Sequence, residues 1–387
     1  MIYLDHHATT PLDPRVFEAM KPFFLEKFGN AASREHEFGR EAADAVEAAR
    51  ARVAALIGAD ESEIVFTSGA TESDNLAIKG HRRQDSRDKI VTVATEHPAV
   101  LDSCAAVERA SNLYVIHLRP GSDGLVDPAK IKAAVDERTL LVSVMFANNE
   151  IGVLQDIPAI GALCKERGAI FHTDAAQAAG KVPIDVRAMD IHLLSLSAHK
   201  MHGPKGIGAL YVRKRIPRVK LQPLIDGGGH EGGLRSGTLN VPAIVGFGAA
   251  CEIARSEMSA EAKRLGKLRD KLWRGLSRGL DLVTLNGHPD QRLPGNLNVS
   301  FKFVESESLM MALAGIAVSS GAACTTTKAE PSHVLKALGL PEDLARSSIR
   351  FGLGRFTTAE EIDTVVERVV AAVKKLRKLS PLYKAGK

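Results

Sequence analysis

The sequence is short of the residue types that build several specialised classes of protein. Its 387 residues include one Trp, four Tyr and four Cys, and no two cysteines form a CxxC pair. Cysteines so far apart suggest neither a zinc knuckle nor a disulfide framework. No apolar stretch approaches the about 20 residues that a membrane-spanning helix needs. The start, MIYLDHHATT, lacks the charged-then-apolar order of a signal peptide. We therefore expect a cytoplasmic protein with no membrane segment.

Charge of one sign is also scarce. The 51 basic and 46 acidic residues leave a formal net charge of +5, and they are scattered along the chain. The nearest approach to a basic run lies between Arg213 and Lys220 and contains no interleaved aromatic residue. Such a run is typical of a solvated face, so no nucleic-acid partner is expected, while an acidic protein partner stays open.

The sequence does contain a regular alternation of short β-branched runs and amphipathic stretches between residues 63 and 212. Runs such as KIVTVAT, LLVSVMF and IHLLSLS alternate with stretches such as TESDNLAIKG and IGALCKERG. This alternation predicts an α/β fold with a mainly parallel sheet covered by helices on both faces. A long helix is expected before it, over residues 39–57, ending at Gly58.

The pattern changes after a helical stretch over residues 242–278. Short strands are expected near 282–285, 296–301 and 348–352, with helices between them and a last helix over 358–378. This order of elements predicts a second, smaller α+β domain.

Polar residues directly follow the apolar runs of the larger domain. The set comprises Thr67 to Glu72 after EIVF, Glu96 and His97 after KIVTVAT, Asn148, Asn149 and Glu150 after LLVSVMF, Asp174 and Gln177 after AIFH, and His199 and Lys200 after IHLLSLS. Ligands of open α/β sheets bind at these carboxyl ends of the strands. Each residue also has an ordinary explanation: Thr71 could form a capping box, His97 or Asp174 could cap a helix, and Lys200 could be a surface cation.

Together these strand ends match the needs of pyridoxal phosphate. That cofactor requires an amine for a Schiff base, a carboxylate that keeps its pyridine nitrogen protonated, and donors for its phosphate, which the start of a helix supplies. A metal site built from His192, His199 and His202 is disfavoured, because no carboxylate or thiolate lies at ligand spacing on the same element.

Several long motifs resemble those of cysteine desulfurases of the IscS and NifS type. They are SLSAHKMHGPKGIGALYVR, FTSGATESDNLAIKG, TEHPAVLDSC and FANNEIGVLQDI, and the resemblance runs from YLDHHATTPLDPRV to SSIRFGLGRFTTAEEID. It implies a class V aminotransferase-like homodimer of fold type I, with a seven-stranded-type sheet. It also implies a large domain over residues 13–257 and a small domain over 1–12 and 258–387. Two departures are HHATT, where relatives often have YSATT or NNATT, and Gly232, where the commoner HERG has an arginine.

The resemblance implies a role for each residue that matches a family motif. Lys200 resembles the Schiff-base lysine, Asp174 the partner of the pyridine nitrogen, and His97 the residue that stacks on the cofactor ring and shuttles protons. Gln177 and Asn149 resemble the groups around the phenolic oxygen. Arg350, with Asn149, resembles the site for the substrate carboxylate. The phosphate contacts correspond to Ala70, Thr71, Ser197 and His199, with Thr238 reaching in from the second subunit.

Cys324 differs from the other cysteines in its surroundings. It lies in SSGAACTTTKAEPSH, among small and hydroxyl residues, whereas Cys164 and Cys251 lie in apolar helical patterns typical of small buried side chains. This composition favours a reactive thiol in an exposed loop. We expect Cys324 to take sulfur from L-cysteine as a persulfide, leaving alanine.

The expected acceptor of that sulfur is an iron–sulfur scaffold or another acceptor protein. Three alternatives share much of the same pattern: a selenocysteine lyase, a class V aminotransferase, and a non-catalytic scaffold that keeps the fold. Cys324 argues against the aminotransferase, because transamination needs no thiol, and Lys200 argues against the scaffold.

Overall fold

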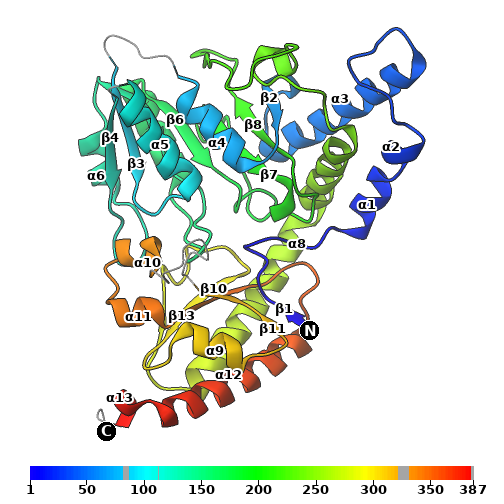
Figure 1. Cartoon of the computed structure of the whole chain (residues 1–387). Helices are drawn as coiled ribbons and strands as arrows, with labels where there is room; N and C mark the ends of the chain where they lie inside the picture. The colour runs from blue at the N-terminus through cyan, green and yellow to red at the C-terminus, as the bar shows by residue number, and fades with distance from the viewer. Residues whose placement is uncertain (82–86, 112, 321–330, 385–387) are drawn as a thin grey trace.

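The computed structural model describes residues 1–81, 87–111, 113–320 and 331–384 (Figure 1). The predicted nucleophile Cys324 lies outside these residues. Two sheets stand apart in the molecule, and the 39-residue helix α8 (Val241–Gly279) runs past both of them. In the described part of the chain, no helix combines the length and the apolar character needed to cross a membrane.

The larger sheet has seven strands in the order β2-β8-β7-β6-β5-β3-β4. They are β2 (Ile64–Thr67), β3 (Lys89–Val93), β4 (Tyr114–Leu118), β5 (Thr139–Ser143), β6 (Ile170–Asp174), β7 (Leu193–Ser197) and β8 (Gly208–Val212). Only β8 is antiparallel to its neighbours, so the prediction of a mainly parallel α/β sheet is confirmed. Strands β3, β5 and β7 are buried along their whole length, as expected for strands covered on both faces.

Helices pack on both faces of this sheet (Figure 1). They are α3 (Glu37–Ile57), α4 (Ala70–Lys79), α5 (Pro98–Ser111), α6 (Pro128–Ala134) and α7 (Ile157–Arg167). The short helices α1 (Pro14–Met20) and α2 (Pro22–Leu25) pack against α8. Short 3₁₀ turns are η1 (Glu61–Glu63), η2 (Ala198–Lys200) and η3 (Glu231–Gly233). Helix α3 ends at Gly58, as predicted, in the left-handed conformation (φ 70°) that favours glycine at this position. It packs against α8 at Gly248, where an added Cβ would lie 2.7 Å from Cα of Ala49.

The smaller sheet has four antiparallel strands in the order β12-β13-β10-β9. They are β9 (Val283–Leu285), β10 (Asn296–Phe301), β12 (Ser319–Ser320) and β13 (Ser348–Gly352), close to the predicted strands. A two-stranded parallel pair joins β1 (Ile2–Tyr3) to β11 (Ile316–Ala317). The surrounding helices are α9 (Ser306–Ala312), α10 (His333–Ala337), α11 (Glu342–Arg346), α12 (Ala359–Leu379) and α13 (Pro381–Lys384).

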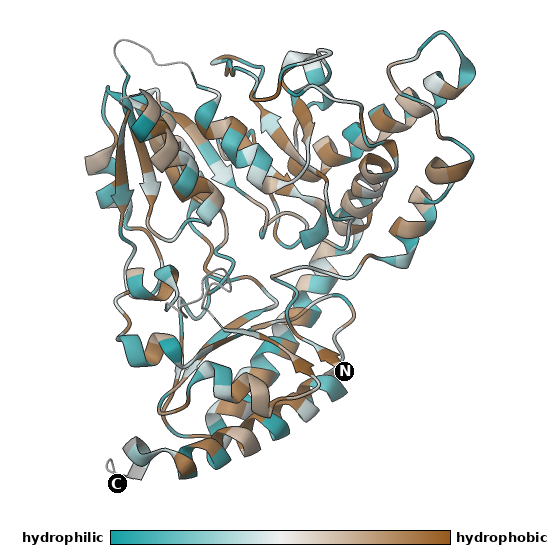
Figure 2. Cartoon of the chain, in the orientation of Figure 1, coloured by the Kyte–Doolittle hydropathy of each residue, from teal (hydrophilic) through white to brown (hydrophobic). Residues whose placement is uncertain are grey.

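The two parts of helix α8 belong to two separate hydrophobic cores. Its first part, up to Ala254, belongs to the core of the larger sheet, whereas Leu265, Leu268 and Leu272 belong to the core formed by β10, β13 and α12. Figure 2 shows the same division, with brown apolar residues along the strands of the large sheet and a mixed brown and teal pattern along α12. A helix with a single apolar stripe is typical of packing against one layer.

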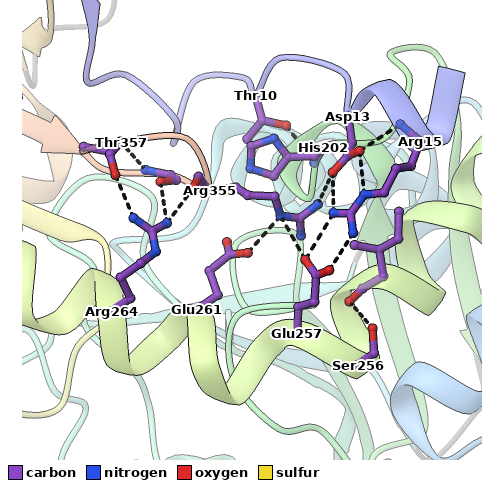
Figure 3. A network of polar contacts seen from close by, with 12 residues as sticks. Thr10, Asp13, Arg15, His202, Ser256, Glu257, Glu261, Arg264, Arg355 and Thr357 are labelled. Carbon is purple, nitrogen blue, oxygen red and sulfur yellow. Dashed lines mark hydrogen bonds and ion pairs between the residues drawn. The ribbon is translucent and has the colours of Figure 1, made fainter.

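Ion pairs fix the N-terminal segment against α8 and the loop after β13 (Figure 3). The buried carboxylate of Asp13 accepts hydrogen bonds from Arg15 and from Arg355, each at 2.8 Å. Arg355 also reaches Glu261 of α8 at 2.9 Å. The two guanidinium groups, Arg15 before Arg355, hold the pKa of Asp13 well below its usual range. Because these charges are satisfied within one cluster, the segment before α1 is held firmly beside the larger sheet.

Candidate active site

The polar strand ends predicted from the sequence meet in one cavity. It measures about 670 Å³ and lies at the carboxyl ends of the parallel strands. The predicted residues that line it are Ala70, Thr71, His97, Asn149, Asp174, Gln177, Ser197, His199, Lys200 and Arg350. Ten side chains from strand ends far apart in the sequence thus share one space, as the position of ligand sites in open α/β sheets requires.

Helix α4 points its first turn at this cavity. Its N-cap is Gly69, which makes no side-chain hydrogen bond, so the capping box considered for Thr71 does not form. The carboxylate of Glu72 instead accepts the backbone N–H of Ser68 at 2.8 Å, one position before the cap. The backbone N–H groups of Ala70 and Thr71 therefore have no capping side chain and, with the helix dipole, suit an anion.

Lys200 is not a surface cation. It ends the turn η2 directly after β7, and its Nζ donates to the backbone carbonyls of His7 and Ala8, both at 2.7 Å. Burial, followed by the positive charge of Arg350, lowers the pKa of Lys200 to about 8. A lysine in this state gives up a proton near neutral pH, which is what a nucleophilic or basic amine requires.

Asp174 is a buried carboxylate at the end of β6. Its Oδ1 accepts the backbone N–H of Ala176 at 2.9 Å, so Asp174 caps a turn, whereas no helix begins there for it to cap. Burial raises the pKa of Asp174, although that backbone hydrogen bond and the charges of His97 and Lys200 act in the opposite direction. Among the described residues Asp174 forms no ion pair, so a cation in the cavity would complete its surroundings.

His97 combines a structural and a cavity-facing position. Its Nδ1 accepts the backbone N–H of Ala99 at 3.1 Å, which caps the first turn of α5 as the alternative explanation proposed. This bond assigns the proton of the neutral ring to Nε2. Burial lowers the pKa of His97, and the negative charge of Asp174 opposes that shift. The ring is therefore neutral and able to stack on a planar ligand or exchange a proton near neutral pH.

Arg350 is held in place by two contacts. Arg350 is part of β13 of the smaller sheet. It donates through Nη2 to Asp5 at 2.7 Å and through Nη1 to the carbonyl of Asn149 at 2.9 Å. Its Nε is buried and has no hydrogen-bond partner. A guanidinium group fixed in this way keeps donors available for a carboxylate in the cavity.

His199 and Gln177 face the cavity from opposite walls. Nδ1 of His199 lies 3.0 Å from the hydroxyl of Thr9. The amide of Gln177 donates to the carbonyl of His7 at 2.8 Å. Both residues are thus positioned by the N-terminal segment, which contributes His7, Ala8 and Thr9 to the cavity wall.

Two predicted residues are not brought together with the others. Thr238 is exposed and does not line this cavity. Cys324 lies outside the described residues. The remaining cysteines, Cys104, Cys164 and Cys251, are fully buried, and burial raises the pKa of both Cys104 and Cys164 to about 12. Thiols in this state are inert, so the interpretation of Cys164 and Cys251 as small core residues is confirmed.

The three histidines considered as metal ligands point to different partners. Nδ1 of His192 accepts the backbone N–H of Phe171, and Nδ1 of His202 lies 3.0 Å from the carbonyl of Pro11. His199 contacts Thr9. Within residues 1–81, 87–111, 113–320 and 331–384, no three His, Cys, Asp or Glu side chains form a group able to hold a metal ion.

Sequence reasoning missed two contributors to the site. The N-terminal segment supplies the carbonyls that hold Lys200, and Lys181 lies beside Gln177. The HHATT departure was the one signal in the sequence for His7. Nothing in the pattern around Lys181, in AAGKVPI, distinguishes it from a surface lysine.

The donor set of the cavity fits pyridoxal phosphate. Asp174 lacks a cation and would face the pyridine nitrogen, while the uncapped first turn of α4 would face the phosphate. Lys200, with its lowered pKa, would hold the aldehyde carbon. Fold and cavity together define a pyridoxal-phosphate enzyme of fold type I.

Comparisons with known proteins agree. The model of the aminotransferase class-V family matches residues 2–365. The cysteine desulfurase IscS of Anaeromyxobacter dehalogenans (strain 2CP-C) is 59% identical over 388 residues, covering 100% of this chain and 96% of the relative. A solved NifS-like protein superposes with a TM-score of 0.89 at 38% identity, covering 97% and 99% of the two chains. A solved complex of SspA with cysteine superposes with a TM-score of 0.81, also at 38% identity, covering 92% and 100%.

This chain belongs to the aminotransferase class-V family of pyridoxal-phosphate enzymes and, within it, to the cysteine desulfurases of the IscS type.

Proposed function

We propose that this protein removes sulfur from L-cysteine with pyridoxal phosphate, releases L-alanine and carries the sulfur as a persulfide on Cys324. The observation that supports this function best is that one cavity is lined both by Lys200, whose pKa is lowered to about 8, and by the buried carboxylate of Asp174. Cysteine is also the molecule named in the SspA complex, whose fold this chain shares.

The residues of the chain divide the work of the reaction. When bound, the cofactor supplies an electron sink that allows bonds at the α- and β-carbons of an amino acid to break. Asp174 would keep the pyridine nitrogen protonated. As a free amine of lowered pKa, Lys200 would accept the α-proton of the substrate. His97, neutral and at the cavity wall, would stack on the ring and exchange protons.

The sulfur transfer is a displacement at the substrate sulfur. The thiolate of Cys324 forms a new S–S bond, the Cβ–S bond of the substrate breaks, and its electron pair stays with the carbon. That carbon takes up protons and leaves as alanine, so L-cysteine and one enzyme thiol give L-alanine and one enzyme persulfide. No external oxidant or reductant is needed.

Recognition of the substrate is assigned to Arg350 and Asn149. The guanidinium group of Arg350 is already fixed by Asp5 and by the carbonyl of Asn149, so little side-chain entropy is lost when it binds a carboxylate. Its free donors suit the α-carboxylate that every amino-acid substrate carries.

The assembly proposed with this function is a homodimer in which Thr238 of one subunit completes the phosphate site of the other. The exposed position of Thr238, away from the cavity of its own chain, is in keeping with that role. We also propose a large domain over residues 13–257 and a small one over 1–12 and 258–387. A cytoplasmic location and delivery of sulfur to an iron–sulfur scaffold or another acceptor protein complete the proposal.

The test compares wild type with Cys324→Ala in assays for alanine and sulfide with L-cysteine. Wild type, yellow with bound cofactor, should form both products, and Cys324→Ala should keep its colour and lose activity. Cys164→Ala is the matched control, because that thiol is buried and inert, and it should retain activity. Activity that survives in Cys324→Ala would contradict the persulfide route and favour a lyase or an aminotransferase.

A further inference from the structure

Lys181 is a half-buried lysine that the reaction described above does not use. It follows β6 by seven residues and lines a second, smaller cavity of about 30 Å³, together with His7, Lys200, His202 and Glu261. Among the described residues Lys181 forms no ion pair. Its Nζ donates to Oε1 of Gln177 at 3.1 Å. A lysine without a counter-ion is costly inside a protein, so its position calls for a functional explanation.

The amide of Gln177 has its orientation fixed from two sides. The atom facing Lys181 must be the oxygen, because an amine is the donor there. The atom facing the carbonyl of His7, at 2.8 Å, must be the nitrogen, because a carbonyl only accepts. Both constraints assign the same orientation. One hydrogen of the amide nitrogen is used by His7, and the other is left for the catalytic cavity that Gln177 also lines.

His7 adds a third constraint on the same amide. Its Nδ1 lies 3.0 Å from Oε1 of Gln177, so the ring donates from Nδ1 and its Nε2 carries no proton. Burial and the nearby charge of Lys181 keep the pKa of His7 well below its usual range, in agreement with a neutral ring. The carbonyl of the same residue accepts from Lys200 at 2.7 Å. His7 thus connects the orientation of Gln177 to the position of Lys200.

We propose that Lys181 and His7 are positioning residues that hold the Gln177 amide with its nitrogen toward the catalytic cavity. This inference rests on the proposed function, since it concerns the site where the cofactor binds. Neither residue touches the reacting atoms; both act through Gln177.

Several ionisable groups lie around Lys181. They are His199 and Lys200 from η2, Glu261 from α8, Arg350 from β13, His202 from the loop after η2, and His6 and His7 from the N-terminal segment. Burial, followed by the charge of Lys200, lowers the pKa of Lys181 to about 7. Glu261 is its only acidic neighbour among these, and its carboxylate is already taken by Arg355.

The experiment measures kcat and KM for L-cysteine with the holoenzyme, whose visible absorbance shows that the cofactor is bound. In Lys181→Met the kcat should fall about tenfold through misplacement of Gln177, and KM should stay within about twofold because Lys181 does not contact the substrate.

Matched variants separate positioning from general disruption. Lys181→Arg keeps the side-chain donors and should keep kcat close to the wild-type value. Lys132→Met removes an exposed lysine of α6 and should change neither kcat nor KM. His7→Phe keeps the main-chain carbonyl and a ring but loses the ring N–H, and kcat should fall about threefold. Thermal unfolding of the apoproteins checks that Lys181→Met is folded; if it is not, His7→Phe carries the test of positioning.

The outcomes distinguish this inference from the proposed function. If wild type binds cofactor and forms alanine while Lys181→Met has the wild-type kcat, the inference is wrong and the function stands. If wild type itself shows no visible band and forms no alanine, both are wrong.

Discussion

Two groups of buried polar side chains, one beside each sheet, differ in how completely they are hydrogen-bonded. In the four-stranded sheet, Nδ2 of Asn286 donates to Asn298 at 2.8 Å, to Ser300 at 2.9 Å and to Ser348 at 3.2 Å. Beneath the seven-stranded sheet, neither carboxylate oxygen of Asp74 makes a hydrogen bond of normal geometry, and Oε2 of Glu96 has no partner.

Unpaired acids beside the catalytic cavity have a common electrostatic consequence. Burial, and secondarily the charge of Asp174, raises the pKa of Asp74 and of Glu96 well above the ordinary range, which favours the neutral form of each carboxyl group. His172 lies 3.6 Å from Asp74, yet burial lowers its pKa to about 3, so the two do not form an ion pair.

The hydrogen-bonded network around Asn286 stabilises the fold, whereas the carboxyl groups of Asp74 and Glu96 lie beside the site. A fully paired network stabilises a sheet and has no proton to exchange at neutral pH. Carboxyl groups left without partners cost stability and are tolerated where the chemistry needs them. In this chain they lie beside the strand ends that carry Asp174 and His97.

The largest expected effect follows from removing the side-chain amine of Lys200, which directly follows a strand of the larger sheet. Lys200→Ala should lower the rate of alanine formation at least about 1,000-fold, because both the nucleophile and the base are lost. The variant should still fold, since Lys200 holds only two carbonyls. Alanine assays and thermal unfolding measure the two effects. A variant that unfolds near the wild-type temperature yet keeps a tenth of the activity would contradict the role of Lys200.

Arg350→Lys tests the contribution that the smaller sheet makes to the cavity. Lysine keeps the charge and loses the planar fork held by Asp5 and Asn149. We expect kcat/KM for L-cysteine to fall about 100-fold, mostly through KM, because carboxylate binding is affected more than chemistry. Steady-state kinetics measure the division. A fall confined to kcat would place Arg350 outside substrate binding.

Asn286→Ala tests the paired network of the smaller sheet. Three hydroxyl and amide partners would lose their donor, so the free energy of unfolding should fall by about 2 kcal/mol. Because Asn286 is remote from the cavity lining, kcat well below the unfolding temperature should stay at the wild-type value. Denaturant unfolding of the apoprotein measures the loss, with exposed Ser277→Ala as control. A comparable loss of kcat would erase the contrast between the sheets.

Asp74→Asn tests the unpaired group and carries the smallest effect. The folded-state pKa of Asp74 lies above its unfolded value, so its carboxyl group stabilises the fold while protonated. That stability is lost as the pH rises from about 4, near the unfolded pKa, toward the raised folded pKa. Asparagine cannot ionise, so the variant should match wild type at low pH and exceed it by about 1 kcal/mol at the top of the window.

Denaturant unfolding of the apoprotein across this pH range measures the effect. Exposed Asp44→Asn serves as the control for loss of a surface carboxylate. A wild-type curve parallel to that of Asp74→Asn at every pH would contradict a raised pKa for Asp74.

Much of this site was accessible from the sequence because period and position are local signals. The apolar runs predicted the strands, and the residues that follow each run, such as Asp174 and Lys200, meet at one sheet edge as expected. His97 and Asp174 each accept a backbone N–H in a turn and also line the cavity. A residue's role as a cap therefore does not argue against a role in a site.

The features that could not be predicted from the sequence depend on contacts between segments far apart in the chain. Lys200 is held by the carbonyl of His7, 193 residues away, and Lys181 meets the same residue only through Gln177. Strand β8 was not named among the predicted strands. Its antiparallel direction could not have been predicted, because its run GALYV carries no signal that distinguishes an antiparallel strand from a parallel one. The direction in which two strands pair and the contacts between distant segments do not appear in the hydrophobic periodicity of a single sequence.

The most direct test of the whole account is to identify the lysine that carries the cofactor. Three lysines, Lys181, Lys200 and Lys205, lie around the two cavities. The protein is loaded with pyridoxal phosphate, reduced with borohydride and digested, and the labelled peptide is located by mass spectrometry. We expect the label on Lys200 alone. A label on Lys181 or Lys205, or no label, would contradict the assignment on which the proposed function depends.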